Sequence, residues 1–188
     1  MNYDPWNVSA NNRIIIAGKN INASDFILSK NGQQLKITSL SENANAPMEV
    51  DFSNFKLVTL TGFVQADSAL ADGTMNGKLT LIDLTSNPVF TGDLTINDLR
   101  IQNDTVGNVH MLVNNKVSNT YNADISITGR GNDVRLAGNY YPMSTTNNFE
   151  FALDMKELPL TTAQAFSEGA IRNASGSVNG KFCRKRNH

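Results

Sequence analysis

The chain has 188 residues, a mass of 20.5 kDa and a formal net charge of -1, with 16 Lys and Arg against 17 Asp and Glu. This balance leaves no broad basic surface, so we do not expect nucleic acid as a partner. Cys183 is the single cysteine, which excludes an intramolecular disulfide and a cysteine-based zinc site. No apolar run approaches the roughly 18 to 20 residues that span a bilayer, and residues 1–5 lack signal-peptide features. We therefore expect no segment of this sequence to insert or export it.

Short bursts of alternating apolar and polar residues run through the chain and predict β-strands. Clusters of Asn, Asp, Gly and Ser, which favour turns, separate these bursts. In most of these bursts one side is consistently apolar and the other polar, as in a sheet that is wetted on a single face. The fold class is therefore expected to be all-β with one or two short helices. The clearest bursts, in chain order, are 26–28, 35–37, 79–81, 94–96, 109–113, 125–127, 134–136 and 149–153.

Two turns and two helices can be placed between the predicted strands. The Asn31-Gly32 pair predicts a tight hairpin, because both residue types accept the positive φ angles of a two-residue loop. Segment 129–133 predicts a second hairpin rather than a phosphate-binding loop, since a strand and not a helix follows it. Residues 57–66 and 161–168 break the alternation, and we predict a short helix in each.

An internal repeat becomes visible when the chain is shifted by 103 residues without gaps. The repeat units span about 48–79 and 151–182, each a strand, a short helix, a turn and a strand. We expect residues 1–188 to form one elongated β module, in which the second unit is truncated, and to be a segment of a longer repeat protein. Identical pairs at this offset include Asp51 and Asp154, Leu57 and Leu160, Phe63 and Phe166, Gly73 and Gly176, and Lys78 and Lys181.

Residues suited to catalysis are sparse and scattered. His110 lies in a predicted strand with no neighbouring Asp, Ser or Cys to act with it, and no calcium-loop or zinc-helix spacing occurs. Trp6 and Tyr140-Tyr141 are more consistent with packing than with stacking on a sugar. We therefore predict a non-enzymatic protein without a cofactor or metal, although sequence spacing leaves open a carboxylate pair assembled by the fold. The carboxylates, mostly near predicted strand ends, are Asp83, Asp93, Asp98, Asp104, Asp124 and Asp133.

The order of these motifs resembles the TamB family of the AsmA-like superfamily. Residues 153–160 are similar to its "L-D-x-x-x-L-x-L" strand, and residues 174–182 to the "A-S-G-x-x-x-G-x-(L/F)" element that follows. Residues 87–94 are similar to "N-P-x-x-x-G-x-L", and residues 129–140 to the hairpin "G-x-G-N-D-x-x-L-x-G-x-Y". The resemblance covers roughly residues 20–182. Compared with the full family pattern, the sequence departs by lacking the N-terminal anchor and the C-terminal barrel-contacting region.

This resemblance implies a trough-shaped sheet in the periplasm of a Gram-negative envelope. Its concave wall would shelter lipid acyl chains or outer-membrane protein segments, with an Omp85-type barrel as partner of the full-length protein. Because such a surface is too apolar to stay exposed, we expect lipid, detergent or a second copy to occupy it, with edge-to-edge pairing as another route to self-association. The alternative is a closed β-sandwich for adhesion or carbohydrate binding, in which the same residues fill a dry core.

The alternation also predicts which side chains line the trough. Within each predicted strand the chosen apolar residues are two positions apart, and side chains two positions apart project to the same face of a strand. The whole set is therefore expected to share one face. The predicted groove residues are Phe26, Leu28, Val50, Phe52, Leu79, Leu81, Leu94, Ile96, Val109, Met111, Ile125, Ile127, Phe149, Phe151 and Leu153.

Overall fold

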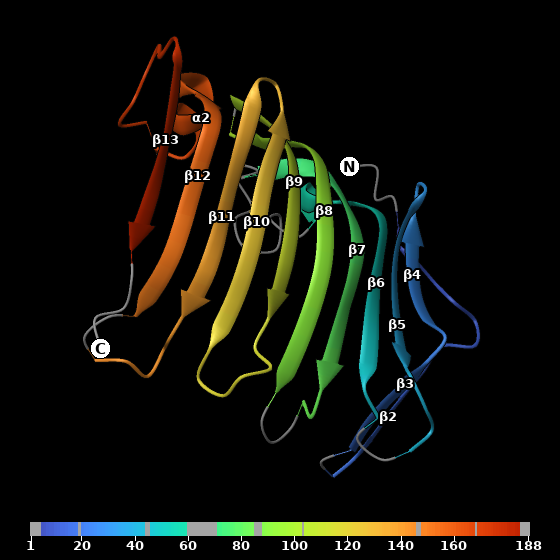
Figure 1. The fold of residues 1–188 in the computed structure, drawn as a ribbon. Helices are drawn as coiled ribbons and strands as arrows, with labels where there is room; N and C mark the ends of the chain where they lie inside the picture. Colours follow the sequence, from blue (N-terminus) through green and yellow to red (C-terminus); the bar gives the residue numbers. More distant parts are fainter. Residues whose placement is uncertain are drawn as a thin grey trace.

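A computed structural model describes residues 5–18, 20–43, 46–59, 71–84, 88–102, 104–145, 148–167 and 169–184. These residues form an eleven-stranded antiparallel sheet, and Figure 1 shows its strands side by side, almost wholly in chain order. A separate two-stranded ribbon, β2 and β3, lies near one end of it. The all-β prediction is confirmed.

The strands lengthen from the N-terminal end toward the middle of the sheet, where β7 and β8 have 12 and 13 residues. The ribbon consists of β2 (Arg13–Ala17) and β3 (Asn20–Ser24). The strands of the large sheet are β1 (Asn7–Val8), β4 (Phe26–Lys30), β5 (Gln33–Ser39), β6 (Met48–Lys56), β7 (Ala71–Ile82), β8 (Val89–Ile101), β9 (Asp104–Asn114), β10 (Tyr121–Gly129), β11 (Asn132–Tyr140), β12 (Phe149–Pro159) and β13 (Ser177–Arg184).

Both predicted hairpins are present, each with a two-residue loop. Lys30 pairs with Gln33 across Asn31 and Gly32, whose φ angles are 49° and 78°. The second loop, between the paired residues at 129 and 132, has φ angles of 56° and 83°. Two successive positive φ angles define the turn whose twist matches that of paired strands, which explains why both loops close a hairpin.

The predicted helix at 161–168 is observed as α2 (Leu160–Ala165). Pro159 precedes it, and because proline has no N–H, strand pairing ends there with the Pro159–Ser177 pair. The helix ends at Phe166, whose N–H donates to the carbonyl of Ala163 at 3.3 Å. Of the other predicted helix, residues 57–59 are helical, and residues 60–66 lie outside the described residues.

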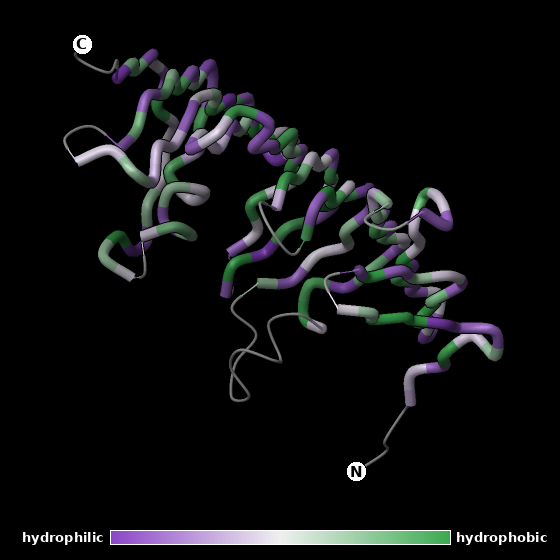
Figure 2. The backbone as a smooth tube through the Cα atoms, turned by 90° about the horizontal axis from the view of Figure 1, so that it is seen from below, coloured by the Kyte–Doolittle hydropathy of each residue, from purple (hydrophilic) through white to green (hydrophobic). Residues whose placement is uncertain are grey.

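The large sheet is a single bent layer that does not close, as Figure 2 shows from below. A β-sandwich needs a second sheet packed face to face at about 10 Å. The second sheet that the described residues form is the β2–β3 ribbon, whose strands have five residues each and which contacts the sheet at β5. The open trough is therefore the observed fold, and the closed-sandwich alternative was wrong.

The buried core lies toward one end of the strands, on the face that α2 covers. This helix packs against β9 and β12, and both helical segments lie behind the sheet in Figure 1. Val106 is 0% exposed, and Trp6 packs against Phe55 with their ring centroids 5.8 Å apart. The buried cluster consists of Phe55, Met75, Leu94, Ile96, Leu99, Val106, Val109 and Ala165.

The β6–β7 and β12–β13 strand pairs, which belong to the two predicted repeat units, have the same register. Each residue pair of the β6–β7 ladder recurs in the β12–β13 ladder after a shift of 103 residues. Both ladders are also interrupted at the same place, between Phe52 and Phe55 and between Met155 and Leu158. The corresponding pairs include Asp51–Lys78 and Asp154–Lys181, Phe52–Gly77 and Met155–Gly180, and Phe55–Met75 and Leu158–Val178.

Candidate functional site

One face of the sheet is apolar across its whole width. Directly paired residues project to the same side of an antiparallel sheet, so the register identifies a row of neighbours. One such row crosses all eleven strands with apolar side chains and a single glycine. At about 4.8 Å per strand it is roughly 48 Å long. The row is Val8, Leu28, Leu35, Phe52, Gly77, Leu94, Met111, Ile125, Leu136, Leu153 and Phe182.

All fifteen predicted groove residues lie on this apolar face. Phe26, Val50 and Leu79 belong to a second row, displaced by two residues from the first, and Ile96, Val109 and Ile127 to a third. Their environments differ along the strands, however. Leu94, Ile96 and Val109 are buried in the core under α2, whereas the other twelve are partly or well exposed.

The end of this face away from α2 is open. Phe149 is 50% exposed and Tyr121 is 43% exposed, in contrast to Phe55 at 3% in the covered part. An aromatic row runs across this end: ring centroids are 6.0 Å apart between Phe90 and Tyr121, 6.1 Å between Tyr121 and Tyr140, and 4.8 Å between Tyr140 and Phe149. Aromatic rings at these separations stabilise one another, so these side chains hold their positions at the open end.

An apolar hollow of 330 Å³ lies on this open end, and we call it the aromatic hollow. Its floor is formed by two small residues, Ala123 and Gly138, which are direct cross-strand partners. A Cβ at Gly138 would lie 2.2 Å from the carbonyl oxygen of Glu150, so β12 approaches too closely for any side chain there. The lining residues are Tyr121, Ala123, Leu136, Gly138, Asn139, Tyr140, Phe149 and Phe151.

The opposite face of the sheet is polar and carries ion pairs. Arg135 donates to Asp124 on the neighbouring strand, from Nε to Oδ1 at 2.8 Å. This hydrogen bond, with the guanidinium charge, holds the pKa of Asp124 below its usual range and raises the pKa of Arg135. Lys181 lies 2.9 Å from Asp154, and its pKa is raised by this carboxylate. The two faces therefore differ sharply in polarity.

Candidate catalytic groups on the described residues are held in structural contacts. His110 does have an acidic neighbour, since its Nε2 lies 2.7 Å from Oδ1 of Asp93 across the β8–β9 pair. Both side chains lie exposed on the polar face. Asp104 accepts hydrogen bonds from Gln164 of α2, and Asp133 pairs with Lys156. Within the described residues no group of three His, Cys, Asp or Glu could hold a metal.

The remaining acidic candidates have turn geometry. Asp83 and Asp98 have φ angles of 49° and 51°, the left-handed conformation that aspartate tolerates better than most residues. Of the aromatic residues considered for sugar stacking, Trp6 packs on the core and Tyr140 belongs to the aromatic row. Tyr141 donates from its hydroxyl to Glu150 at 3.0 Å.

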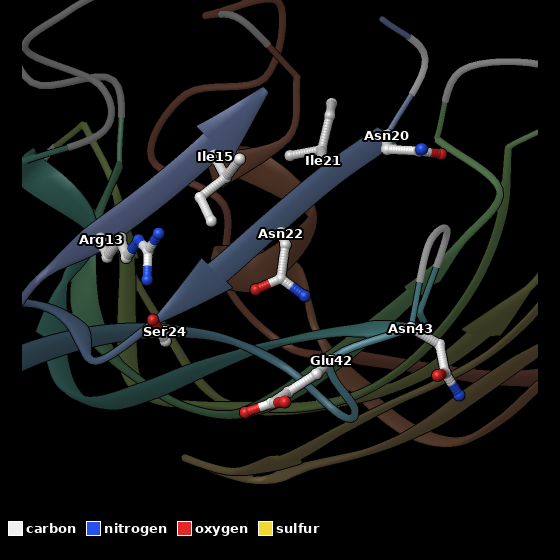
Figure 3. A pocket seen from close by; sticks show the side chains of 8 residues that line it. All are labelled: Arg13, Ile15, Asn20, Ile21, Asn22, Ser24, Glu42 and Asn43. Carbon is white, nitrogen blue, oxygen red and sulfur yellow. The ribbon is translucent and has the colours of Figure 1, made fainter. Parts of the chain in front are cut away.

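A second, polar hollow of 440 Å³ lies between the β2–β3 ribbon and the turn after β5 (Figure 3). Arg13, Asn22 and Glu42 contribute to its wall, and the Asn22 side chain donates to the carbonyl of Ser41 at 3.1 Å. The backbone N–H of Ala23 donates to Ser39 Oγ at 2.9 Å. These bonds attach the ribbon to the sheet, which accounts for the polar residues at this place.

Sequence reasoning missed the residues that shape the aromatic hollow. Tyr121, Ala123 and Leu136 were not among the predicted groove residues, although each shares a strand face with one that was or pairs with one. The period-two pattern does contain this signal, since Tyr121 and Ala123 precede Ile125 at steps of two. Gly138 gives no such signal, because its role depends on the approach of β12.

Comparisons with protein-family models, with curated proteins and with solved structures found no match in any of the three. None of the helical segments in the described part of the chain has the length and apolar character needed to cross a membrane.

Proposed function

We propose that this chain is a non-enzymatic cell-envelope module of the TamB type that shelters lipid acyl chains on its apolar face. The observation that carries the proposal is the continuous apolar row across eleven strands, which borders the aromatic hollow at Leu136. In the proposal the module works in the periplasm, and contact with an Omp85-type barrel is a property of the longer protein.

The apolar face is exposed at its end away from α2, and this exposure supports a bound ligand rather than a bare surface. Monomeric proteins rarely leave a large continuous apolar patch in water. Phe149, Tyr121, Tyr140 and Phe182 are all exposed on one face of this sheet. An acyl chain laid over them gains about 0.8 kcal/mol for each methylene removed from water, less the cost of ordering the chain.

The chemistry of the hollow favours an acyl chain over a peptide segment. A peptide lying on a sheet face brings backbone N–H and C=O groups, which need hydrogen-bond partners when they leave water. The hollow wall is almost entirely aromatic and aliphatic carbon, because the side chain of Asn139 hydrogen-bonds Asn122 on the polar face. A hydrocarbon chain has no such requirement. Outer-membrane protein segments therefore become the second candidate cargo.

The same wall supports a conduit rather than an enzyme. A substrate pocket combines an apolar lining with a few polar groups that fix the orientation of the ligand. Here the charged side chains of Asp93, Asp124 and Arg135 lie on the opposite face. A wall without orienting groups lets a chain slide along the row, which is what transport of many lipid species requires.

The test is to fill the hollow. Ala123→Leu adds three carbons to the floor, and Ala152→Leu, on an exposed position of the polar face, is the matched control. Each protein is purified from Gram-negative cells and examined by native mass spectrometry and lipid extraction. We expect phospholipid with the unsubstituted chain and with Ala152→Leu, and little with Ala123→Leu. A lipid-free unsubstituted chain, or equal lipid in all three, contradicts the proposal.

A further inference from the structure

A polar hollow of 310 Å³ adjoins the aromatic hollow, and we call it the loop hollow. Its lining comes from residues 88–89 before and in β8, residues 115–116 and 118–121 around the β9–β10 loop, and Pro142 after β11. Tyr121 lines both hollows, so an apolar space and a polar space meet at one side chain. An amphiphile whose acyl chain lies in the aromatic hollow therefore has a polar site directly beside it.

The loop that forms the polar site is attached to the start of β8. The side chain of Asn115 accepts a hydrogen bond from the N–H of Phe90 at 2.7 Å and donates one to the carbonyl of Pro88 at 2.9 Å. Within the loop, the N–H of Thr120 donates to the carbonyl of Val117 at 3.1 Å and closes a turn. These bonds hold the loop against the sheet, so its side chains are presented at defined places beside the aromatic hollow.

Lys116 gives the loop hollow a positive charge. The ion pairs that the described residues form do not include this exposed lysine, and the described lining contains no acidic residue. Ser118 and Asn119 also line the hollow, and in the described part of the chain neither side chain has a hydrogen-bond partner. An ammonium group, a hydroxyl and a carboxamide can all donate to phosphate oxygens. The chemistry of the loop hollow therefore fits a phosphate group.

Tyr121 suits the boundary between the two hollows. Its ring belongs to the aromatic row, with Phe90 on one side and Tyr140 on the other. A tyrosine has an apolar ring and a polar hydroxyl tip, which is why this residue type is frequent where an apolar region meets water. A ligand that crosses from the aromatic hollow to the loop hollow changes from acyl chain to headgroup at the same place.

A second cation lies on the same face, on the other side of the aromatic hollow. Arg184 pairs with Phe151 across β12 and β13, and directly paired residues project to the same side of a sheet. Arg184 already interacts with another group of the protein, whereas Lys116 has no acidic partner among the described residues. Lys116 is therefore the better placed of the two to bind an anion.

We infer that the loop hollow binds the phosphate of a phospholipid whose acyl chain lies in the aromatic hollow, with Lys116 as the charged contact. The inference rests on the proposed lipid function and adds a place for the headgroup to it. Because the phosphate is common to phospholipids, the site orients the lipid at the rim without selecting one headgroup. The wall of the aromatic hollow itself needs no charge for this purpose.

Two soluble probes with the same acyl chains test the phosphate contact. Dioctanoyl phosphatidic acid has the phosphate and dioctanoylglycerol lacks it, and titration calorimetry on the whole chain gives the Kd of each. A charge-assisted contact strengthens binding, so we expect the phosphate probe to bind about tenfold more tightly. Equal Kd values would overturn the inference.

Glycerol 3-phosphate distinguishes a lipid headgroup from free phosphate. It has the phosphate but no acyl chain, so it loses the burial of apolar area and should bind more than about a hundredfold more weakly than the phosphatidic acid probe. Similar Kd values for these two would show a general phosphate site and would overturn the inference.

Variants of the whole chain assign the phosphate to one side chain. Lys116→Gln should abolish the tenfold preference and leave the Kd for dioctanoylglycerol unchanged, whereas Lys116→Arg should keep the preference. Lys156→Gln removes a lysine from an exposed ion pair with Asp133, and as the matched control it should keep the preference. A preference that survives Lys116→Gln, or that is lost in Arg184→Gln alone, places the phosphate elsewhere and contradicts the inference.

Failure of the phosphate site differs from failure of the proposed function. If neither lipid probe binds, the acyl site is absent, and the proposed function and the inference are both wrong. If both probes bind with the same Kd in the unsubstituted chain and in Lys116→Gln, the acyl site stands and only the phosphate site is wrong.

Discussion

The two ends of the apolar face are built from the same kinds of residues but have opposite fates. At the covered end, α2 and Trp6 close over the sheet, and Phe55, Val106 and Val109 become a core. At the open end, Tyr121 and Phe149 remain exposed around the aromatic hollow. The difference shows that alternation in a strand determines which side is apolar, whereas a covering element decides whether that side becomes core or binding surface.

The largest expected effect is at the covered end. Phe55→Ala removes a buried ring that contacts Trp6 and Phe52, and should lower the free energy of unfolding by about 3–5 kcal/mol. Phe149→Ala removes a half-exposed ring and should cost below about 1 kcal/mol, because little area leaves the interior. Urea denaturation of both variants measures the contrast. Similar losses at the two sites would mean that the open end is packed as a core.

The floor of the hollow gives an intermediate effect. Gly138→Ala forces a Cβ to 2.2 Å from the Glu150 carbonyl, so the backbone of β12 must move, at a cost of about 1–3 kcal/mol. Gly92→Ala meets the end of the Leu79 side chain at 2.5 Å, which can change rotamer, and should cost less. The unfolding temperatures of the two variants show which substitution is more destabilising. The reverse order would show that the close approach of β11 and β12 is not rigid.

A charge at the open end should change binding more than stability. Phe149→Asp places a carboxylate at the rim of the hollow and should abolish phospholipid retention, while the free energy of unfolding changes by about 1 kcal/mol or less. Ile82→Asp, a half-exposed position on the polar face, is the matched control and should retain lipid. Lipid extraction and urea denaturation are measured on the same preparations. Loss of lipid in both variants would show that lipid binds to exposed apolar residues in general and not to the hollow.

The smallest effect expected is the pH dependence of the polar face. Arg135 lowers the pKa of Asp124 from its ordinary value of 3.8, so the ionised form is favoured in the folded state. The contribution of Asp124 is therefore complete above about pH 5 and is lost as the pH falls below about 4 through the folded-state pKa. Asp124→Asn should show a shallower loss of stability between pH 5 and pH 3, measured by urea midpoints. An identical slope in the two proteins would show that the pair contributes nothing.

Sequence patterns by themselves determined much of this molecule. Period-two alternation located β4, β5 and β7 to β12 but not β1 or the β2–β3 ribbon. It also placed all fifteen predicted groove residues on one face, because a strand turns its side chains to alternate sides wherever it lies. The Asn31-Gly32 turn was readable for the same local reason, since its φ angles depend on the two residues themselves.

Tertiary structure alone decided what the apolar face became. The place of α2 over β9, the pairing of His110 with Asp93 and the close approach at Gly138 all join residues far apart in the chain. Local patterns carry no information about such contacts, because an apolar side chain has the same sequence signature whether a helix covers it or water does. The covered core and the open hollow therefore differ in their neighbours and not in their own sequence.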